Sequence, residues 1–137
     1  MISLVMDTSN SYLAVGLYQD NMCLEAFQEK GSRRQSEKAI PTLKEVLDRH
    51  DIALKDVNEM IITSGPGSYT GVRVAMTIAK TLAAVSDVRI KSVSSLAAYA
   101  GMNQALSVID ARGHKVFVGV YENGLPLIKE QVMTLED

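Results

Sequence analysis

The sequence predicts an α/β fold in which a mixed sheet with flanking helices is followed by the first strands of a second, incomplete lobe. Three short apolar segments open the chain, and helical and strand patterns alternate after them. The early segment VMDTSNSYLAVGLY also returns later as VIDARGHKVFVGVY. An internal repeat of this kind indicates a duplicated lobe.

The composition is that of a globular protein. With 137 residues, 47% of them hydrophobic and 22% charged, the chain can form one domain of ordinary size and a piece of another. A net charge of -2 argues against direct, strong nucleic-acid binding, because such domains carry excess Lys and Arg. The apolar stretches are too short for a membrane span and no signal peptide is evident, so we expect a cytoplasmic protein. The single cysteine, Cys23, is expected to fill space in a strand.

The first elements are three strands and a helix. Residues 2–6, 12–18 and 22–27 are apolar runs separated by the polar breaks SNS and DN, which predicts an antiparallel meander. Residues 36–49 carry apolar side chains at three- and four-residue spacing, which predicts one amphipathic helix. Pro41 lies in its first turns, where a missing N–H is tolerated best.

The next elements alternate between strands and helices. Residues 57–63 predict a strand, and after a Gly-Pro-Gly turn a helix runs from Ser68 or Thr70 to Val85. A short strand at 89–93 and a helix at 95–100 follow. This order of three strands, helix, strand, helix, strand and helix resembles the ribonuclease H-like lobe of the actin-like ATPase superfamily.

The repeat places the start of a second lobe near residue 104. At an offset of 103 residues the two copies share Val, Asp, Val, Gly and Tyr, and both end a strand in an acid, Asp7 or Asp110. We therefore assign residues 1–103 to the first lobe and 104–137 to the start of a second lobe, which we expect to be truncated. We expect the apolar faces of the strand around residues 116–120 to lack helical cover and to be buried by another chain.

The segment GPGSYTGVR is the most specific in the chain. Gly65 and Gly67 permit backbone conformations closed to other residues, and Ser68 or Thr70 can cap the helix that follows. Such a loop can hold an anion, but a phosphate-binding loop also needs a Lys after its last glycine, and Val72 stands there. We favour a structural turn, with anion binding as the alternative.

Together with MDTS, RRQSE, VSSL and IDARGHKVF, this segment makes nearly the whole chain similar to the TsaB (YeaZ) family. The chain differs from the family pattern at Gln35, where a His is expected, and at Gly113, where a second Arg is common. The resemblance implies a non-catalytic subunit that binds TsaD, together with TsaE, for threonylcarbamoyl transfer to an adenosine of tRNA. It also implies a homodimer when the subunit is alone.

The residues after each acid support the absence of catalysis. ATPases of this superfamily typically place Gly two residues after the acid, whereas Ser9 and Arg112 occupy those positions here. We expect no catalytic residue, no metal, no cofactor and at most weak nucleotide binding. The expected vestigial nucleotide cleft consists of Asp7, Thr8, Ser9, Gly65, Gly67, Ser68, Thr70, Gly71, Asp110 and Arg112.

The second helix predicts a partner interface. On a helical wheel its apolar residues form two stripes, one around Ala75 and Ala79 and the other around Val74 and Ile78. We expect one stripe to face the sheet and the other a copy of the chain or TsaD, although both can also be covered within the lobe. The expected interface residues are Val72, Arg73, Val74, Met76, Ile78, Ala79, Leu43 and Leu47.

Two other functions stay open from the sequence. One is an enzyme of the same superfamily, either an ATP-dependent phosphotransferase or a glycoprotease-like peptidase. A peptidase of this kind would need two histidines paired on one helix to bind its metal, whereas His50 and His114 are far apart in this sequence. The other is a plain structural lobe of a larger protein.

Overall fold

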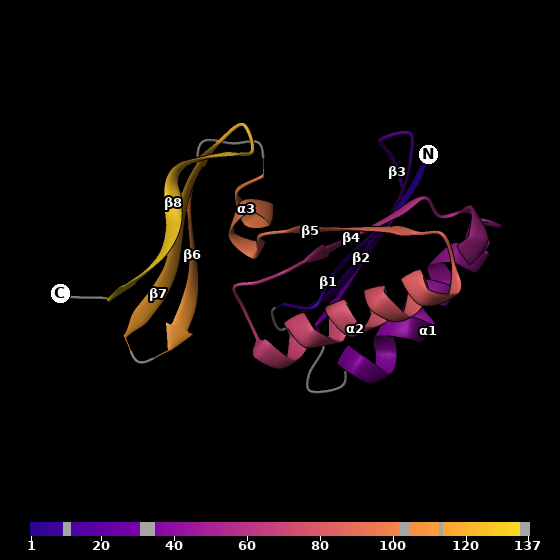
Figure 1. Ribbon diagram of the computed structural model, residues 1–137, viewed down its shortest axis with the longest axis horizontal. Helices are drawn as coiled ribbons and strands as arrows, with labels where there is room; N and C mark the ends of the chain where they lie inside the picture. The colour runs from indigo at the N-terminus through magenta and orange to yellow at the C-terminus, as the bar shows by residue number, and fades with distance from the viewer. Residues whose placement is uncertain (10–11, 31–34, 102–104, 113, 135–137) are drawn as a thin grey trace.

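The computed structural model describes residues 1–9, 12–30, 35–101, 105–112 and 114–134. They form a five-stranded sheet of order β3-β2-β1-β4-β5 and a three-stranded sheet of order β6-β7-β8 (Figure 1). The expected element order and the α/β fold class are confirmed. In chain order the elements are β1 Ile2–Asp7, β2 Tyr12–Gln19, β3 Met22–Lys30, α1 Gln35–Arg49, η1 Leu54–Asp56, β4 Glu59–Thr63, α2 Tyr69–Val85, β5 Arg89–Val93, α3 Ser95–Ala100, β6 Ala105–Arg112, β7 Lys115–Glu122 and β8 Leu125–Thr134.

Strand β1 is the centre of the larger sheet. It pairs antiparallel with β2 and parallel with β4, and β4 pairs parallel with β5. Because parallel strands end at the same edge of a sheet, the carboxyl ends of β1 and β4 bring Asp7 and Thr63 together. No helix in the described part of the chain is long and apolar enough to cross a membrane.

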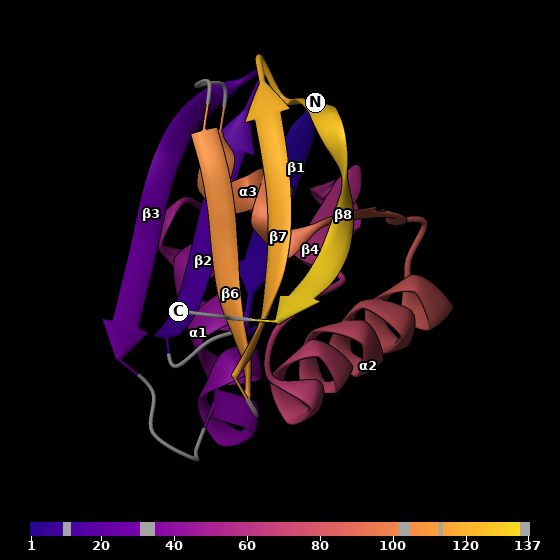
Figure 2. The same cartoon turned by 90° about the vertical axis from the view of Figure 1, so that its left-hand side faces the viewer.

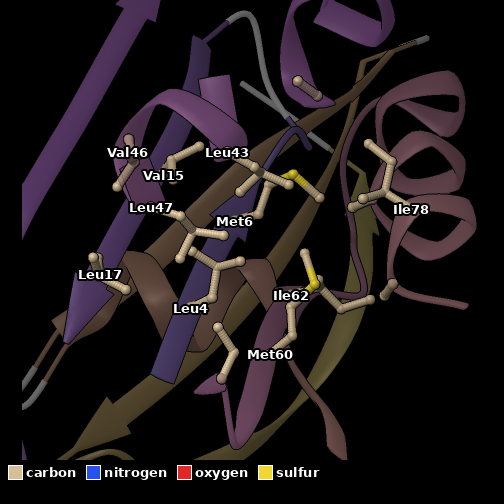
Figure 3. Packing of buried hydrophobic residues seen from close by; sticks show 14 of the residues in the cluster. Leu4, Met6, Val15, Leu17, Leu43, Val46, Leu47, Met60, Ile62 and Ile78 are labelled. Atoms are coloured by element: carbon tan, nitrogen blue, oxygen red, sulfur yellow. The ribbon is translucent and has the colours of Figure 1, made fainter. Parts of the chain in front are cut away.

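The main core lies between the larger sheet and helices α1 and α2, which share one of its faces (Figures 1 and 3). Leu4 and Met6 of β1 point toward the helices and are 1% and 0% exposed, whereas Val5 between them is only half-buried. This alternation is the period of two that a strand imposes. The buried cluster comprises Leu4, Met6, Leu13, Val15, Leu17, Ala39, Leu43, Val46, Leu47, Val57, Met60, Ile62, Ala75, Ile78, Ala79 and Val88.

Helix α2 buries one broad face, and the expectation of two opposite apolar faces is wrong. Ala75, Ile78 and Ala79 are all buried in the same cluster. At about 100° per residue, Ile78 and Ala79 lie on either side of Ala75, so the two stripes are the flanks of a single buried face. Leu82, which belonged to neither stripe, also packs against this core.

The repeated V-G-x-Y segment has a packing explanation. A Cβ atom on Gly16 would lie 2.9 Å from the ring of Tyr18, and one on Gly119 would lie 2.6 Å from the ring of Tyr121. In both copies the glycine leaves room for the tyrosine ring two residues later on the same face of the strand. The pairing differs by one residue, because Gly16 pairs with Val5 whereas Gly119 pairs with Ser107.

The smaller sheet packs on the short helix α3 (Figure 2). Leu96 and Tyr121 form its buried centre, with Ala97, Ile109 and Phe117 packed around them. Among the side chains described in this sheet, five large apolar ones are exposed, namely Leu106, Leu125, Leu127, Val132 and Met133.

Two sequence-based expectations about the smaller sheet have different outcomes. Val116, expected to lack cover, is only 8% exposed, so that expectation is wrong for this residue, while Val118 and Val120 are half-buried. The boundary between residues 103 and 104 falls within 102–104, which lie outside the described residues. It therefore stays a prediction.

Candidate functional site

The carboxylate of Asp7 is the centre of a hydrogen-bond network at the end of β1. Its Oδ1 accepts hydrogen bonds from Thr63 Oγ1 at 2.6 Å, from Ser9 Oγ at 2.6 Å and from the Ser9 backbone N–H at 2.9 Å. Ser95, the first residue of α3, is fully buried and donates its hydroxyl to Ser9 Oγ at 3.1 Å. The acid therefore joins β1 to β4 directly and to α3 through Ser9.

The loop before α2 packs directly on the residues that follow Asp7. Thr8 and Ser9 are 0% and 2% exposed. Thr8 Oγ1 donates to the carbonyl of Gly71 at 2.5 Å, and the Ser68 N–H donates to the carbonyl of Ser9 at 2.8 Å. The start of α2 is thus bonded to the two residues that follow Asp7.

This close contact explains two of the glycines. A Cβ atom on Gly71 would lie 1.8 Å from the carbonyl oxygen of Thr8, and one on Gly67 would lie 2.3 Å from that of Ser9. Gly65 has a positive φ of 102°, which favours glycine, and its carbonyl accepts the N–H of Ser95 at 2.8 Å. The Gly65–Pro66 bond is cis.

Three N–H groups at the end of this loop and the start of α2, those of Ser68, Gly71 and Val72, are bonded to acceptors within the protein. Ser68 is the N-cap of α2 and accepts the Gly71 N–H on its side chain at 3.2 Å, while the Val72 N–H donates to the Ser68 carbonyl at 2.9 Å. Thr70 lies in the first turn and is exposed, so the open choice between the two caps falls on Ser68. This bonding favours a structural turn over an anion site.

The second acid of the repeat has a known backbone position only. Asp110 and Arg112 belong to β6 and pair with Val116 and Lys115 of β7, with a register shift between them. Their side chains are outside the described part of the structure. A cleft with Asp7 on one side and Asp110 on the other therefore stays a prediction.

An apolar groove lies between α1 and α2. Its volume is about 250 Å³, and Lys44 and Asp48 of α1 contribute charged groups to its lining. The apolar lining includes Leu4, Ile40, Leu43, Leu47, Ile78 and Leu82. Ile40 is 57% exposed, so a large apolar side chain stands in water beside an apolar hollow.

The structure separates the eight expected interface residues into two groups. Leu43, Leu47, Ile78 and Ala79 are buried in the chain's own core, at 5%, 7%, 6% and 0% exposure, so they do not form an exposed surface. The buried four are inside because α1 and α2 pack on the same face of the sheet. The other four lie on α2, where Val72, Val74 and Met76 are half-buried and Arg73 is exposed.

Sequence reasoning missed Thr63, Ser95 and Ile40. Thr63 ends the strand predicted at residues 57–63, but its place beside Asp7 follows from the parallel pairing of β4 with β1, which was not assigned from the sequence. Ser95 was placed only at a helix start, and no local pattern pairs it with Ser9. Cys23, expected to fill space in a strand, belongs to β3 but is exposed.

Comparison with known proteins places the chain in a family. The family model described as "TsaD: tRNA N6-adenosine threonylcarbamoyltransferase" matches residues 28–136. The chain is 34% identical to the "tRNA threonylcarbamoyladenosine biosynthesis protein TsaB" of Bacillus subtilis, over 100% of this chain and 64% of that protein. It is 31% identical to the protein of the same name from Escherichia coli, over 89% of this chain and 57% of that protein.

A solved structure agrees with these relatives. "YeaZ from Pseudomonas aeruginosa" superposes with a TM-score of 0.88 at 29% identity, over 96% of this chain and 67% of that one. The chain thus spans less than two thirds of the length of the two TsaB relatives. Because the family model and the fold agree over most of the chain, it belongs to the family that this model describes and, within it, to the TsaB (YeaZ) proteins.

Proposed function

We propose that this chain is a non-catalytic subunit that binds TsaD, together with TsaE, for threonylcarbamoyl transfer to an adenosine of tRNA. The family supplies the pathway, since its TsaB members are named as threonylcarbamoyladenosine biosynthesis proteins. The observation that carries the non-catalytic role is the closed segment after Asp7. Buried Thr8 and Ser9 and the glycine loop fill the space where a phosphate would approach the acid.

A calorimetric titration tests the non-catalytic role. Asp7 Oδ1 already accepts three hydrogen bonds. The N–H groups of Ser68, Gly71 and Val72 donate to two protein carbonyls and a hydroxyl. We expect ATP with Mg²⁺ to give no more than weak binding to the chain alone. Sub-micromolar binding together with ATP hydrolysis would instead support the phosphotransferase alternative.

We propose the α1–α2 groove as the surface that receives TsaD. The exposed apolar side chain of Ile40 lies at the groove, whose lining is largely apolar. Protein interfaces commonly bury an apolar anchor residue in such a pocket. In the absence of TsaD, a second copy of the chain would cover the same surface. Val72, Val74 and Met76 of α2 are half-buried and do not line this groove, so their part in the interface stays a prediction.

The test is one substitution with a matched control. Ile40→Glu puts a charge into the apolar contact, and we expect it to weaken co-purification with TsaD by at least tenfold and to shift any dimer toward monomer in light scattering. Met22→Glu makes the same kind of change at a side chain that is 69% exposed and absent from the groove lining, and should have no effect. Equal binding by the two variants would exclude the groove. Ile78→Glu and Ala79→Glu are unsuitable because both side chains are buried and the variants would unfold.

A further inference from the structure

The junction between the two sheets contains two adjacent serines with different partners. Ser95 reaches back into the first lobe, where its hydroxyl bonds Ser9 and its N–H bonds the carbonyl of Gly65. Ser94 reaches the other way and donates its hydroxyl to Glu130 of β8. Helix α3 lies between the two sheets (Figure 1), and the hydrogen bonds of Ser94 and Ser95 tie its start to both of them.

The hydroxyl of Ser94 uses its one donor and both of its acceptor positions. As the N-cap of α3, its oxygen accepts the N–H groups of Leu96 at 3.2 Å and Ala97 at 3.5 Å. Its one O–H donates to the carboxylate of Glu130. A hydroxyl has one donor and two acceptor positions, so a single side chain can cap the helix and bind the second sheet at the same time.

Glu130 receives a second donor from the centre of the smaller sheet. The hydroxyl of Tyr121 donates to the same carboxylate oxygen, Oε1. Tyr121 is only 2% exposed and packs against Leu96 of α3. Burial, and then the hydrogen bond to Glu130, raises the pKa of Tyr121, so the phenol stays a donor at neutral pH. Gly119 makes room for this ring.

We propose that Ser94, Tyr121 and Glu130 form an interlobe latch that fixes the angle between the two sheets. Helix α3 packs on β6 and β7, and Ser95 holds that helix to the Asp7 network. The latch supplies the directional bonds on the other side of the helix, because apolar contact alone is non-directional. When the latch opens, the smaller sheet turns about α3 while the first lobe stays intact.

A pair of substitutions at Ser94 separates the latch from helix capping. Asp and Asn are both good N-cap residues, so Ser94→Asp and Ser94→Asn keep the cap. Only Ser94→Asp sets a negative charge against Glu130, whose like charge repels it. Adding Glu130→Gln to Ser94→Asp removes that repulsion.

The readout is the distance between two spin labels measured by double electron–electron resonance on the full chain. One label is attached to the exposed native Cys23 of β3 and the other to Leu125→Cys, a position that is 69% exposed in the smaller sheet. We expect a single narrow distribution for Ser94→Asn. Ser94→Asp should give a broader distribution with a shifted mean, and the added Glu130→Gln should restore the narrow one.

The opposite results would overturn the proposal. Equal distributions for Ser94→Asp and Ser94→Asn in folded protein, or a broad distribution that Glu130→Gln does not narrow, would show that no such latch acts. If Ser94→Asp fails to fold, Glu130→Ala replaces it, with Glu122→Ala as the control at an exposed position of β7. Glu130→Ala should also speed hydrogen exchange of the Leu96 and Ala97 amides by about tenfold. No difference from Glu122→Ala in either measurement would overturn the proposal.

Discussion

At the scale of single residues, the site depends on backbone contacts that only glycine permits. Gly71 lies where the start of α2 touches the end of β1, and its carbonyl accepts the hydroxyl of Thr8. The local pattern Gly-Pro-Gly-Ser predicted a structural turn and left anion binding as the alternative. The structure gives these glycines the role of spacers between two segments of the chain.

Replacement of Gly71 tests this role. In a helix interior Gly→Ala normally stabilises by about 1 kcal/mol, but here the new Cβ would lie 1.8 Å from the Thr8 carbonyl oxygen. We expect Gly71→Ala to lower the free energy of unfolding by about 2–4 kcal/mol in urea titrations. Ala84→Gly, on the exposed side of α2, is the control and should lose only about 1 kcal/mol. A stabilising Gly71→Ala would contradict the contact.

The bond from Thr63 to Asp7 makes a second prediction. Thr63 is 6% exposed and donates to Asp7 Oδ1 at 2.6 Å. Thr63→Val keeps the shape but removes the donor, and we expect a loss of about 1–3 kcal/mol in the free energy of unfolding because a charged acceptor loses a partner. Thr63→Ser keeps the hydroxyl and should lose less. Equal losses for Val and Ser would show that packing, and not the hydrogen bond, matters there.

At the scale of elements, the C-terminus of α1 is tied to β3 by a charged cluster. Glu25 of β3 accepts hydrogen bonds from Arg49 and contacts His50 Nε2 at 2.9 Å. The pKa of Glu25 is lowered to about 2, mainly by the hydrogen bonds from Arg49 and to a smaller extent by the hydrogen bond with His50. A positive side chain in the last turn also suits the negative end of the helix dipole.

This cluster predicts a pH dependence of stability. Because the folded-state pKa of Glu25 lies below its ordinary value of about 4.3, the cluster stabilises the fold above that pH. The contribution is lost as the pH falls from about 4 through 2. We expect Glu25→Gln to lower Tm at pH 7 and to have less effect near pH 2, with a smaller difference in high salt because Arg49 is half exposed. A Tm difference independent of pH would contradict the pKa.

At the scale of the whole molecule, the two sheets differ in the size of the hydrophobic cluster that packs against each of them. Among the side chains that the structure describes, the larger sheet and its helices enclose sixteen buried hydrophobic residues, whereas the cluster under the smaller sheet has two, Leu96 and Tyr121. In the described chain the smaller sheet also exposes Leu106, Leu125 and Met133. A three-stranded sheet with so little buried surface is expected to open more readily.

Native-state hydrogen exchange measures this difference. We expect the amides of β6–β8 to exchange by sub-global opening, at least tenfold faster than those of β1 and β4, which lie inside the larger sheet. The turn amides of both sheets serve as the fast reference. Identical protection in the two sheets would mean that the chain unfolds as one cooperative unit.

The sequence by itself determined the elements, their order and the family. Periods of two and of three to four residues are set by local chemistry, so β5, α3 and the meander could be found without tertiary information. Gly16 and Gly119 were visible as a repeat for the same reason, because each makes room for a tyrosine only two residues away.

Only the tertiary structure decided which side chains meet. The two apolar stripes of α2 looked like separate faces because a helical wheel shows only the angle of each residue around the helix. It does not show how wide the sheet surface is that packs against the helix and buries both stripes. The bonds from Thr63 to Asp7, from Ser95 to Ser9 and from Ser94 to Glu130 join residues 36 to 86 positions apart. No local period encodes contacts of that range, because packing of the sheet against its helices sets them.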